Sequence, residues 1–358
     1  MHESYQSSLS AQRRSELRAQ RTARRKAKLR AQRRKRMLQA IPIFVLLVAL
    51  GTLFFVRARQ QRFQEDNSDP EVSAFVPKPQ ATVTNNPVPY HADCTADTIA
   101  LSEEIDSLYA ILIDLQNNTV LAEKSSDHPI SPASMTKILT LLVAVEHMSN
   151  PNDTVTITRE ITDYCFTHDC SVVGYMVDDQ PTVTELLYGT ILPSGADAAL
   201  ALANYIAGSQ EAFVDLMNKK LSELGISETA HFTNCVGLYD EKHICTVYDM
   251  AMILKAAMEN DLCRKVLSTH SYPLATTESR PEMQTMSNLF LRRIEDHDQD
   301  LTVRAVGAKT GYVMQAGSCA ASWGEDTQGN RYICVTGNAT SSWRVIYDHV
   351  ALYALCGS

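Results

Sequence analysis

The sequence predicts an α+β fold for residues 99–358, and two observations support this prediction. Short runs typical of strands occur near the start of this part, at 107–114 and 119–124, and again near its end, at 303–308 and 332–337. Several segments with helical periodicity lie between these two groups. Strands at both ends of a chain with helices between them are typical of an α+β domain.

The N-terminal part differs sharply in composition from this domain. Residues 1–37 contain 13 Lys and Arg against two acidic residues, a net charge of +11 in a chain whose total is −8. Residues 37–56 carry no formal charge. At about 1.5 Å per residue they are long enough to cross a bilayer core of roughly 30 Å. The basic residues before them predict a cytoplasmic tail at 1–37 and an uncleaved transmembrane signal anchor at 38–56.

Two alternatives compete with this interpretation of the N-terminus. A cleaved signal peptide is disfavoured by the long basic leader and by the lack of a convincing small-residue cleavage site. The basic tail could bind nucleic acid, but beside a membrane span its effect on topology and its contact with anionic lipid explain it better. We therefore expect the lipid bilayer, and no nucleic acid, as a partner. The expected location is the cell membrane, with a single pass and an extracellular domain.

Residues 57–98 are expected to form a linker between the anchor and the domain. They contain five prolines among Asn, Gln, Ser, Asp and Thr, a composition typical of an extended spacer. From residue 99 to 358 the composition is globular, and the whole chain is 45% hydrophobic and 21% charged, enough for a sizeable core. This region is expected to form a single extracellular domain.

The helices of this domain are expected at six places, with the first running apolar from Lys137 onwards and Thr184 capping the second. The expected ranges are 134–148, 185–192, 198–207, 212–224, 247–258 and 344–355.

A serine and a lysine three positions apart, Ser134 and Lys137, stand at the start of the first helix. Residues i and i+3 share a helix face, so the amine can lie over the hydroxyl. A serine hydroxyl is a poor nucleophile until a base takes its proton, and a desolvated lysine can be that base. The pattern S-x-x-K alone is frequent by chance, so further motifs are needed before a catalytic role can be assigned to it.

Two further motifs follow in order, Ser194-Gly195-Ala196 and Lys309-Thr310-Gly311. With these three motifs together, the chain resembles the serine D-alanyl-D-alanine carboxypeptidases, the low-molecular-mass penicillin-binding proteins of the peptidase S11 type. The resemblance covers roughly residues 100–358. It implies a β-lactamase/transpeptidase-like fold, with an antiparallel sheet and a helical subdomain.

The resemblance also implies catalytic roles. Ser134 would attack the carbonyl of the D-Ala-D-Ala peptide bond, and Lys137 would be its general base. Ser194 would relay a proton to the departing D-alanine. Ala196 departs from the family pattern, which has asparagine there. That amide normally contacts the catalytic lysine and the substrate backbone, so slower catalysis or altered specificity is expected.

The substrate-binding residues are expected around the third motif. Lys309 and Thr310 would hold the substrate carboxylate on a strand edge, and Gly311 would keep that edge clear of a side chain. The backbone N–H of Tyr312, with that of the nucleophile, would form the oxyanion hole. Arg344 falls where such enzymes carry an arginine for the terminal carboxylate, and a solvated arginine is the alternative.

The predicted function is that of a serine-type D-Ala-D-Ala carboxypeptidase acting on peptidoglycan stem pentapeptides through a Ser134 acyl-enzyme. The alternative is a homologue that binds wall peptides or organises division with little turnover. A β-lactamase or esterase on the same scaffold is less well supported, because no convincing counterpart of the β-lactamase glutamate is found. β-Lactams are therefore expected as covalent inhibitors.

All nine cysteines follow the predicted anchor, where disulfides are permitted. The close pairs Cys165/Cys170 and Cys235/Cys245 are the predicted bridges. Residues 165–170 could hold zinc, but no second cluster accompanies them. No metal and no cofactor are predicted.

Overall fold

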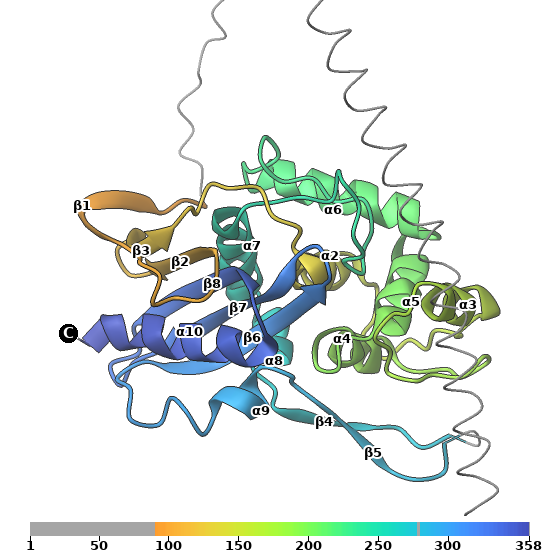
Figure 1. Cartoon of the computed structure of the whole chain (residues 1–358). Helices are drawn as coiled ribbons and strands as arrows, with labels where there is room; N and C mark the ends of the chain where they lie inside the picture. Colours follow the sequence, from red (N-terminus) through yellow and green to blue (C-terminus); the bar gives the residue numbers. More distant parts are fainter. Residues whose placement is uncertain (1–89, 278–279, 358) are drawn as a thin grey trace, which may run out of the picture. The chain divides into compact units, whose positions relative to one another are not determined.

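The computed structural model describes residues 90–277 and 280–357 (Figure 1). The predicted basic tail, the signal anchor and most of the predicted linker lie outside these residues. Within the described ranges, no helix is both long and apolar enough to span a bilayer.

The described chain forms a six-stranded sheet, a two-stranded sheet and a set of helices. The main sheet contains β1 (Asp93–Ala100), β2 (Tyr109–Asp114), β3 (Thr119–Lys124), β6 (Arg304–Val313), β7 (Gly317–Glu325) and β8 (Arg331–Ala339), and the small sheet β4 (Ser271–Leu274) and β5 (Gln284–Ser287). The helices are η1 (Ala133–Thr136), α2 (Lys137–His147), α3 (Arg159–Thr167), α4 (Val183–Ile191), α5 (Ala196–Ala207), α6 (Gln210–Glu223), α7 (Val247–Glu259), α8 (Asp261–Leu267), α9 (Leu291–Ile294), α10 (Ser342–Ala354) and η2 (Leu355–Gly357).

The main sheet joins the two ends of the domain, which confirms the α+β prediction. Its strand order is β1-β3-β2-β8-β7-β6, and β2 pairs with β8 in antiparallel register, with Ile111 opposite Val335. Both side chains are fully buried. Because β6 is the last strand in this order, one of its edges is not paired within the sheet.

The predicted antiparallel sheet needs one correction. β1 pairs in parallel with β3, whereas the other strand pairs of the sheet are antiparallel. The chain passes from β1 across to β2 before it returns along β3, so β1 and β3 run in the same direction. Most of β1 lies in the segment predicted as linker. Its side chains are almost all exposed, so its sequence lacks the apolar alternation that indicates a strand.

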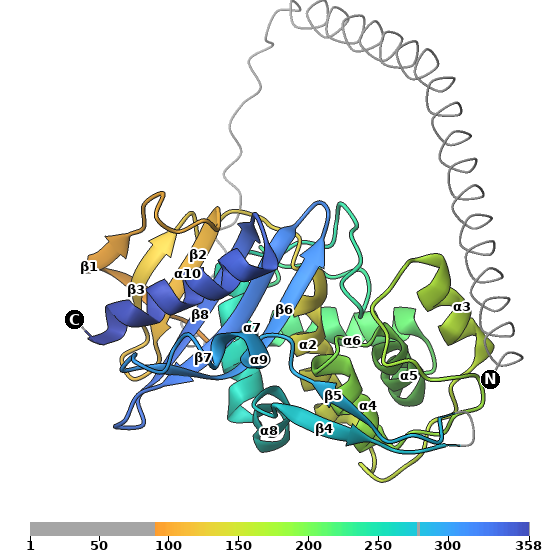
Figure 2. The ribbon, with the colours of Figure 1, turned by 60° about the horizontal axis from the view of Figure 1, so that its bottom comes forward.

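Helices cover both faces of the sheet (Figure 2). α10 packs against β7 and β8 on one face, and α7 packs against β2 and β8 on the other. Helices α2 to α6 form the helical part of the domain on the β6 side of the sheet (Figure 1). α4 begins earlier than predicted, because Thr182 and not Thr184 is its cap: the Thr182 hydroxyl accepts a hydrogen bond from Glu185 N (3.1 Å).

Several elements were not predicted from the sequence. Besides β1, they include α3, α8, α9, the β4–β5 hairpin and the central strand β7. β7 is rich in small residues and buried along nearly its whole length. A strand buried on both faces shows no polar alternation, which explains why the pattern missed it.

Candidate active site

The site is built around the turn that carries Ser134. This turn is the 3₁₀ helix η1, and α2 begins directly after it at Lys137. Gly237 packs against the turn with φ = +82°. A Cβ atom at Gly237 would lie 2.0 Å from the Ala133 carbonyl oxygen, so only glycine permits this approach.

Ser134 and Lys137 form a direct contact, as their spacing predicted. Lys137 Nζ lies 3.0 Å from Ser134 Oγ and donates a 2.6 Å hydrogen bond to the carbonyl oxygen of Val236. The Lys137 side chain is 2% exposed. Burial lowers the pKa of Lys137 to about 8, although nearby cysteines and Asp197 oppose the shift. A lysine with such a pKa is partly neutral near pH 8 and can accept a proton.

Asn234 holds the loop that supplies the Val236 carbonyl. Its side-chain oxygen accepts hydrogen bonds from the backbone N–H groups of residues 236, 237 and 238, at 3.3, 2.7 and 3.0 Å. Its side-chain nitrogen donates to the Leu238 carbonyl oxygen (3.0 Å). The whole amide is thus used to fix one tight loop behind Lys137.

A buried histidine supports the same turn from the other side. Thr233 N donates to His243 Nδ1 (3.0 Å), so Nε2 carries the proton and donates to Thr136 Oγ1 (2.8 Å). Burial lowers the pKa of His243 to about 3, which keeps the imidazole neutral. His243 therefore acts as a hydrogen-bonding link between the 233–238 loop and η1.

A second serine–lysine pair lies opposite the first. Lys309 Nζ donates to Ser194 Oγ (2.9 Å) and to the Thr310 carbonyl oxygen (2.7 Å). Ser194 adopts φ = +66°, unusual for a residue with a side chain. Burial, and then the charge of Lys137, hold the pKa of Lys309 well below its ordinary value. An anion bound beside Lys309 would favour its charged form again.

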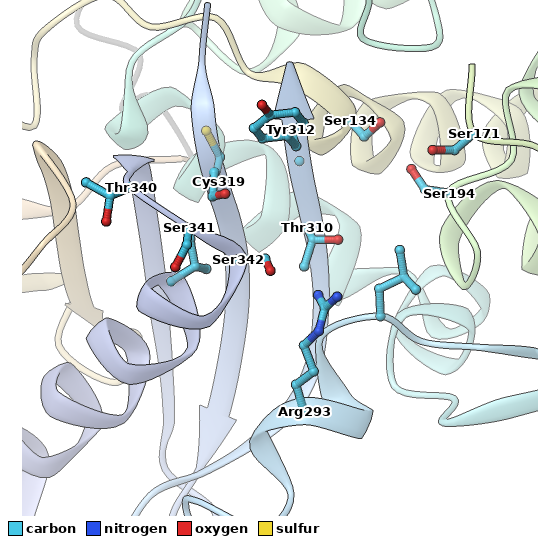
Figure 3. Close-up of a pocket in the computed structure, with 14 residues that line it drawn as sticks. Ser134, Ser171, Ser194, Arg293, Thr310, Tyr312, Cys319, Thr340, Ser341 and Ser342 are labelled. Carbon is cyan, nitrogen blue, oxygen red and sulfur yellow. The ribbon is translucent and has the colours of Figure 1, made fainter. Parts of the chain in front are cut away.

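The serines of these two pairs line one cavity of about 440 Å³, and the two lysines lie buried behind them. Ser134, Ser171 and Ser194 line one end of it, and the segment 340–342 at the start of α10 lines the other (Figure 3). Thr310 of β6 lies between the two ends. Because the edge of β6 borders the cavity, an extended peptide can lie along this strand.

The arginine of the cavity is not the one the sequence indicated. Arg293, on α9, lines the cavity and directs its guanidinium group into it (Figure 3). Arg344 lies on α10, is exposed and is not among the lining residues. Tyr312 lines the cavity and is 67% exposed. Arg293 was missed because nothing in the sequence distinguishes it from its neighbour Arg292.

Gly311 has a structural role besides the one predicted for it. A Cβ atom there would meet the Pro132 carbonyl oxygen at 2.9 Å and Met135 N at 3.1 Å. The glycine therefore lets β6 pack directly against η1, which brings the third motif close to the first. Gly311 also lines the cavity, and its role in keeping the strand edge clear for a peptide stays a prediction.

Ala196 and Asp197 both bind residues 171–175, a segment whose Ser171 side chain lines the cavity. Ala196 is 2% exposed, and its backbone N–H donates to the Ser171 carbonyl oxygen (2.8 Å). The Asp197 carboxylate accepts hydrogen bonds from the backbone N–H groups of residues 173, 174 and 175. Asp197 is thus engaged with the backbone. Ser171, which lines the cavity, places a hydroxyl near Ser194 (Figure 3).

The predicted disulfides are absent, and all nine cysteines are free. The thiols of Cys235 and Cys245 belong to different surroundings: Cys235 Sγ lies near Gln210 Oε1 (3.5 Å), whereas Cys245 pairs through its backbone with Ile130. The Cys165 and Cys170 side chains are hydrogen-bonded to each other. In the described part of the chain, no three or more His, Cys, Asp or Glu residues are grouped to hold a metal ion.

Comparison with known proteins identifies what the fold and site are similar to. A model of the D-alanyl-D-alanine carboxypeptidase family, peptidase S11, matches residues 95–341. D-alanyl-D-alanine carboxypeptidase DacF of Bacillus subtilis is 32% identical over 222 residues, which are 62% of this chain and 54% of that protein. The D-alanyl-D-alanine carboxypeptidase of Streptomyces sp. strain K15 is 33% identical over 213 residues, 56% of this chain and 70% of that protein.

Solved structures show the same fold. The crystal structure of the Streptomyces K15 DD-transpeptidase matches with a TM-score of 0.63 and 27% identity, covering 70% of this chain and 98% of that one. The D-alanyl-D-alanine carboxypeptidase from Mycobacterium tuberculosis H37Rv matches with a TM-score of 0.60 and 25% identity, over 69% and 90% of the two chains. The described domain therefore has the transpeptidase/β-lactamase-like fold. The chain spans about half the length of the Bacillus relative.

Proposed function

The chain belongs to the D-alanyl-D-alanine carboxypeptidase family, peptidase S11, and on that basis we propose that it removes the terminal D-alanine from peptidoglycan stem pentapeptides. The observation that carries the proposal is the pairing of Lys137 Nζ with Ser134 Oγ at 3.0 Å, opposite the Lys309–Ser194 pair. Two lysine–serine pairs facing one cavity supply a nucleophile, a base and a proton relay.

Acylation starts with a neutral Lys137. Its amine takes the Ser134 hydroxyl proton while Ser134 Oγ attacks the carbonyl carbon of the D-Ala-D-Ala bond. The negative charge that develops on the carbonyl oxygen is stabilised by the backbone N–H groups of Ser134 and Tyr312. Support for the base comes from the burial of Lys137, which lowers its pKa to about 8.

The tetrahedral intermediate collapses when the leaving D-alanine nitrogen receives a proton. Ser194 delivers it and receives in return the proton that Lys137 took from Ser134, so that Lys137 is neutral again for the next step. The Ser194 hydroxyl is suited to this relay because it is hydrogen-bonded to Lys309 Nζ and borders the cavity. Water then attacks the acyl-Ser134 ester, again with Lys137 as base, and releases the tetrapeptide. Every step uses side chains of this chain, and no metal or cofactor enters the scheme.

The substrate lies along the open edge of β6. Lys309 and Thr310 hold its terminal carboxylate, and the Arg293 guanidinium, which lines the same cavity, supplements them. An anion beside Lys309 would restore the charge that burial disfavours. Arg344 is a proposed contact only for a longer ligand that extends beyond the cavity, since it does not line it.

The alternative, a homologue that binds wall peptides or organises division with little turnover, is not favoured. Its premise was the loss of the motif amide at Ala196, yet the Ser134–Lys137 contact is formed without that amide. The same serine is proposed to react with β-lactams and to release them slowly, so that they act as covalent inhibitors.

We also propose that residues 38–56 anchor the protein in the cell membrane, with residues 1–37 cytoplasmic and the domain from residue 99 extracellular. The support is the uncharged 20-residue run after 13 basic residues. Peptidoglycan stem peptides and bilayer lipid are then its partners.

The deciding experiment combines labelling with product release. The full chain is incubated with a fluorescent penicillin, and with a D-Ala-D-Ala-terminated pentapeptide whose D-alanine release is measured. The expected result is a covalent label on Ser134, absent in Ser134→Ala, together with the release of one D-alanine per pentapeptide over many turnovers. Labelling without release would favour the binding alternative, and rapid hydrolysis of the penicillin would favour a β-lactamase.

A further inference from the structure

Cys165 and Cys170 lie at the two ends of a short turn that leads to Ser171, a residue of the active-site cavity. Cys165 lies near the end of α3, and the chain turns back so that Cys170 N donates to the Cys165 carbonyl oxygen (2.9 Å). Their side chains are hydrogen-bonded to each other as well. The turn between them is exposed, and Asp169 within it has φ = +50°. The two cysteines therefore lie side by side across this turn while both thiols are free.

The two thiols are chemically unequal. Cys165 donates its hydrogen to the Cys170 sulfur, which lowers the pKa of Cys170 to about 7, helped by the positive charge of Lys137. The same hydrogen bond, with burial, raises the pKa of Cys165. A thiolate at neutral pH next to a protonated thiol is the arrangement of an attacking and a resolving cysteine.

The pair is reachable from solvent. Both cysteines line a surface cavity of about 300 Å³, together with Thr162, Asp169 and Asp197. Cys170 is itself partly exposed. Other cysteines lack this combination: Cys235, for example, is fully buried, and burial raises its pKa to about 12.

The chain that follows Cys170 reaches the active-site cavity at Ser171. We call residues 171–175 the wall segment: Ser171 lines the cavity, and its carbonyl oxygen accepts a hydrogen bond from Ala196 N (2.8 Å). Its next backbone N–H groups, at 173 to 175, bind the Asp197 carboxylate. Cys170 thus directly precedes the segment that is hydrogen-bonded to Ala196 and Asp197, next to the Ser194 loop.

We propose that Cys165 and Cys170 form a redox-active dithiol that is oxidised by exchange with a small-molecule or protein disulfide, and that the resulting bridge fixes the wall segment against the Ser194 loop. The Cys170 thiolate attacks one sulfur of the incoming disulfide and forms a mixed disulfide, while the other sulfur leaves as a thiolate and takes the Cys165 proton. Cys165 then attacks the Cys170 sulfur and expels the second thiolate. The two protein sulfurs are oxidised to a disulfide, and the external disulfide is reduced to one thiol, which carries the Cys165 proton, and one thiolate, which takes a proton from water.

The chemical part of the proposal is tested on the reduced full chain at neutral pH. We expect iodoacetamide to alkylate Cys170 about tenfold faster than the exposed Cys94, which serves as internal reference. Oxidised glutathione should give a Cys165–Cys170 bridge in a peptide map. In Cys165→Ser the reaction should stop at a glutathione adduct on Cys170, whereas Cys94→Ser should behave like the unchanged chain. Equal alkylation of Cys170 and Cys94, or an adduct that persists without bridging in the unchanged chain, would overturn it.

The structural part is tested by hydrogen exchange on the reduced and bridged forms. The amides of residues 173–175 and of Ala196 should exchange about threefold or more slowly in the bridged form. The bridge closes the loop 165–170 and so restrains the segment that follows it, which donates to Asp197 and accepts from Ala196 N. Unchanged exchange at these amides, with the bridge formed, would overturn the coupling to the cavity. Neither measurement uses Ser134, so both outcomes are independent of the proposed peptidase activity.

Discussion

Lys137 Nζ donates a 2.6 Å hydrogen bond to the carbonyl oxygen of Val236, a residue 99 positions later in the chain. A neutral amine has two hydrogens and one lone pair. With one hydrogen directed at Val236, the amine can turn its lone pair toward Ser134 Oγ, 3.0 Å away. The position of Val236 therefore orients the proposed base, and Asn234, through its three accepted hydrogen bonds, positions Val236.

Replacing Asn234 with alanine tests this chain of contacts. The change leaves three backbone N–H groups of the loop without their acceptor, so the free energy of unfolding should fall by about 1–3 kcal/mol. Acylation by a fluorescent penicillin should slow by about tenfold to a hundredfold, because a small displacement of Val236 misdirects Lys137. Urea unfolding and stopped-flow labelling give the two numbers.

The matched control is Asn234→Asp, which keeps an acceptor oxygen for the same three N–H groups. Acylation in this variant should recover at least in part. If Asn234→Ala were destabilised but acylated at the unchanged rate, Asn234 would support the fold without positioning the base.

The pKa of Lys137 predicts how acylation depends on pH. Because burial lowers this pKa to about 8, the amine is protonated below pH 8 and cannot accept the Ser134 proton. The rate constant for penicillin acylation should therefore fall about tenfold per pH unit below about 8 and level off above it. Lys137→Ala should lose about 10²–10⁴-fold in rate and also lose this pH dependence. A profile in the unchanged chain that is flat between pH 6 and 9 would contradict the role of Lys137.

Lys309 should take up a proton when a carboxylate binds. In the empty cavity burial and Lys137 hold the pKa of Lys309 well below its ordinary value, and a neighbouring carboxylate would raise it again. Calorimetric titration of Ser134→Ala with a D-Ala-D-Ala peptide, in buffers of different ionisation enthalpy, measures this uptake. Lys309→Met should bind more weakly and without buffer dependence; buffer-independent binding by the unchanged Lys309 would contradict the prediction.

The serine and lysine motifs were predictable because their chemistry depends on residue type and short spacing. Ser134 and Lys137 are three residues apart, and the apolar run after Lys137 indicated a helix that buries the amine. Arg293 and Val236 were not predictable in this way. Their place in the site depends on tertiary packing, and Val236 acts through its backbone carbonyl, which every residue possesses.

In the fold, too, some elements were predictable from the sequence and others were not. β2, β3 and the helices with apolar stripes carry local patterns that the sequence reveals. β1 is mostly exposed and β7 mostly buried on both faces, so neither alternates. Gly311 was recognised as part of a motif. The need for a glycine there, the close approach of β6 to η1, was not predictable, because η1 lies almost 180 positions earlier in the chain.

Gly311→Ala tests that reason. The new Cβ would lie 2.9 Å from the Pro132 carbonyl oxygen and 3.1 Å from Met135 N, so β6 or η1 must move. Overpacking of this kind should cost about 1–3 kcal/mol of unfolding free energy, and acylation of Ser134 should slow because η1 carries it. The matched control is Gly337→Ala on β8, where the nearest atom is a side-chain methyl of Ile130 at 3.2 Å. Equal effects of the two changes on acylation would contradict a specific role for Gly311.

Ala196→Asn restores the amide that the family motif has at this position. Ala196 is the buried first residue of α5, and its backbone N–H already donates to the Ser171 carbonyl oxygen. A side-chain amide there would add a hydrogen-bonding group for Lys137 and for the substrate backbone. We expect D-alanine release to rise by about tenfold, the value of one well-placed hydrogen bond of roughly 1–1.5 kcal/mol. Ala196→Leu adds the same number of side-chain heavy atoms in the same branched shape, but without the polar group, and should slow release. If both variants slowed release equally, the surroundings of Ser171 would be packed too tightly to accept the amide. The absence of asparagine at position 196 could then not be the reason for a low turnover.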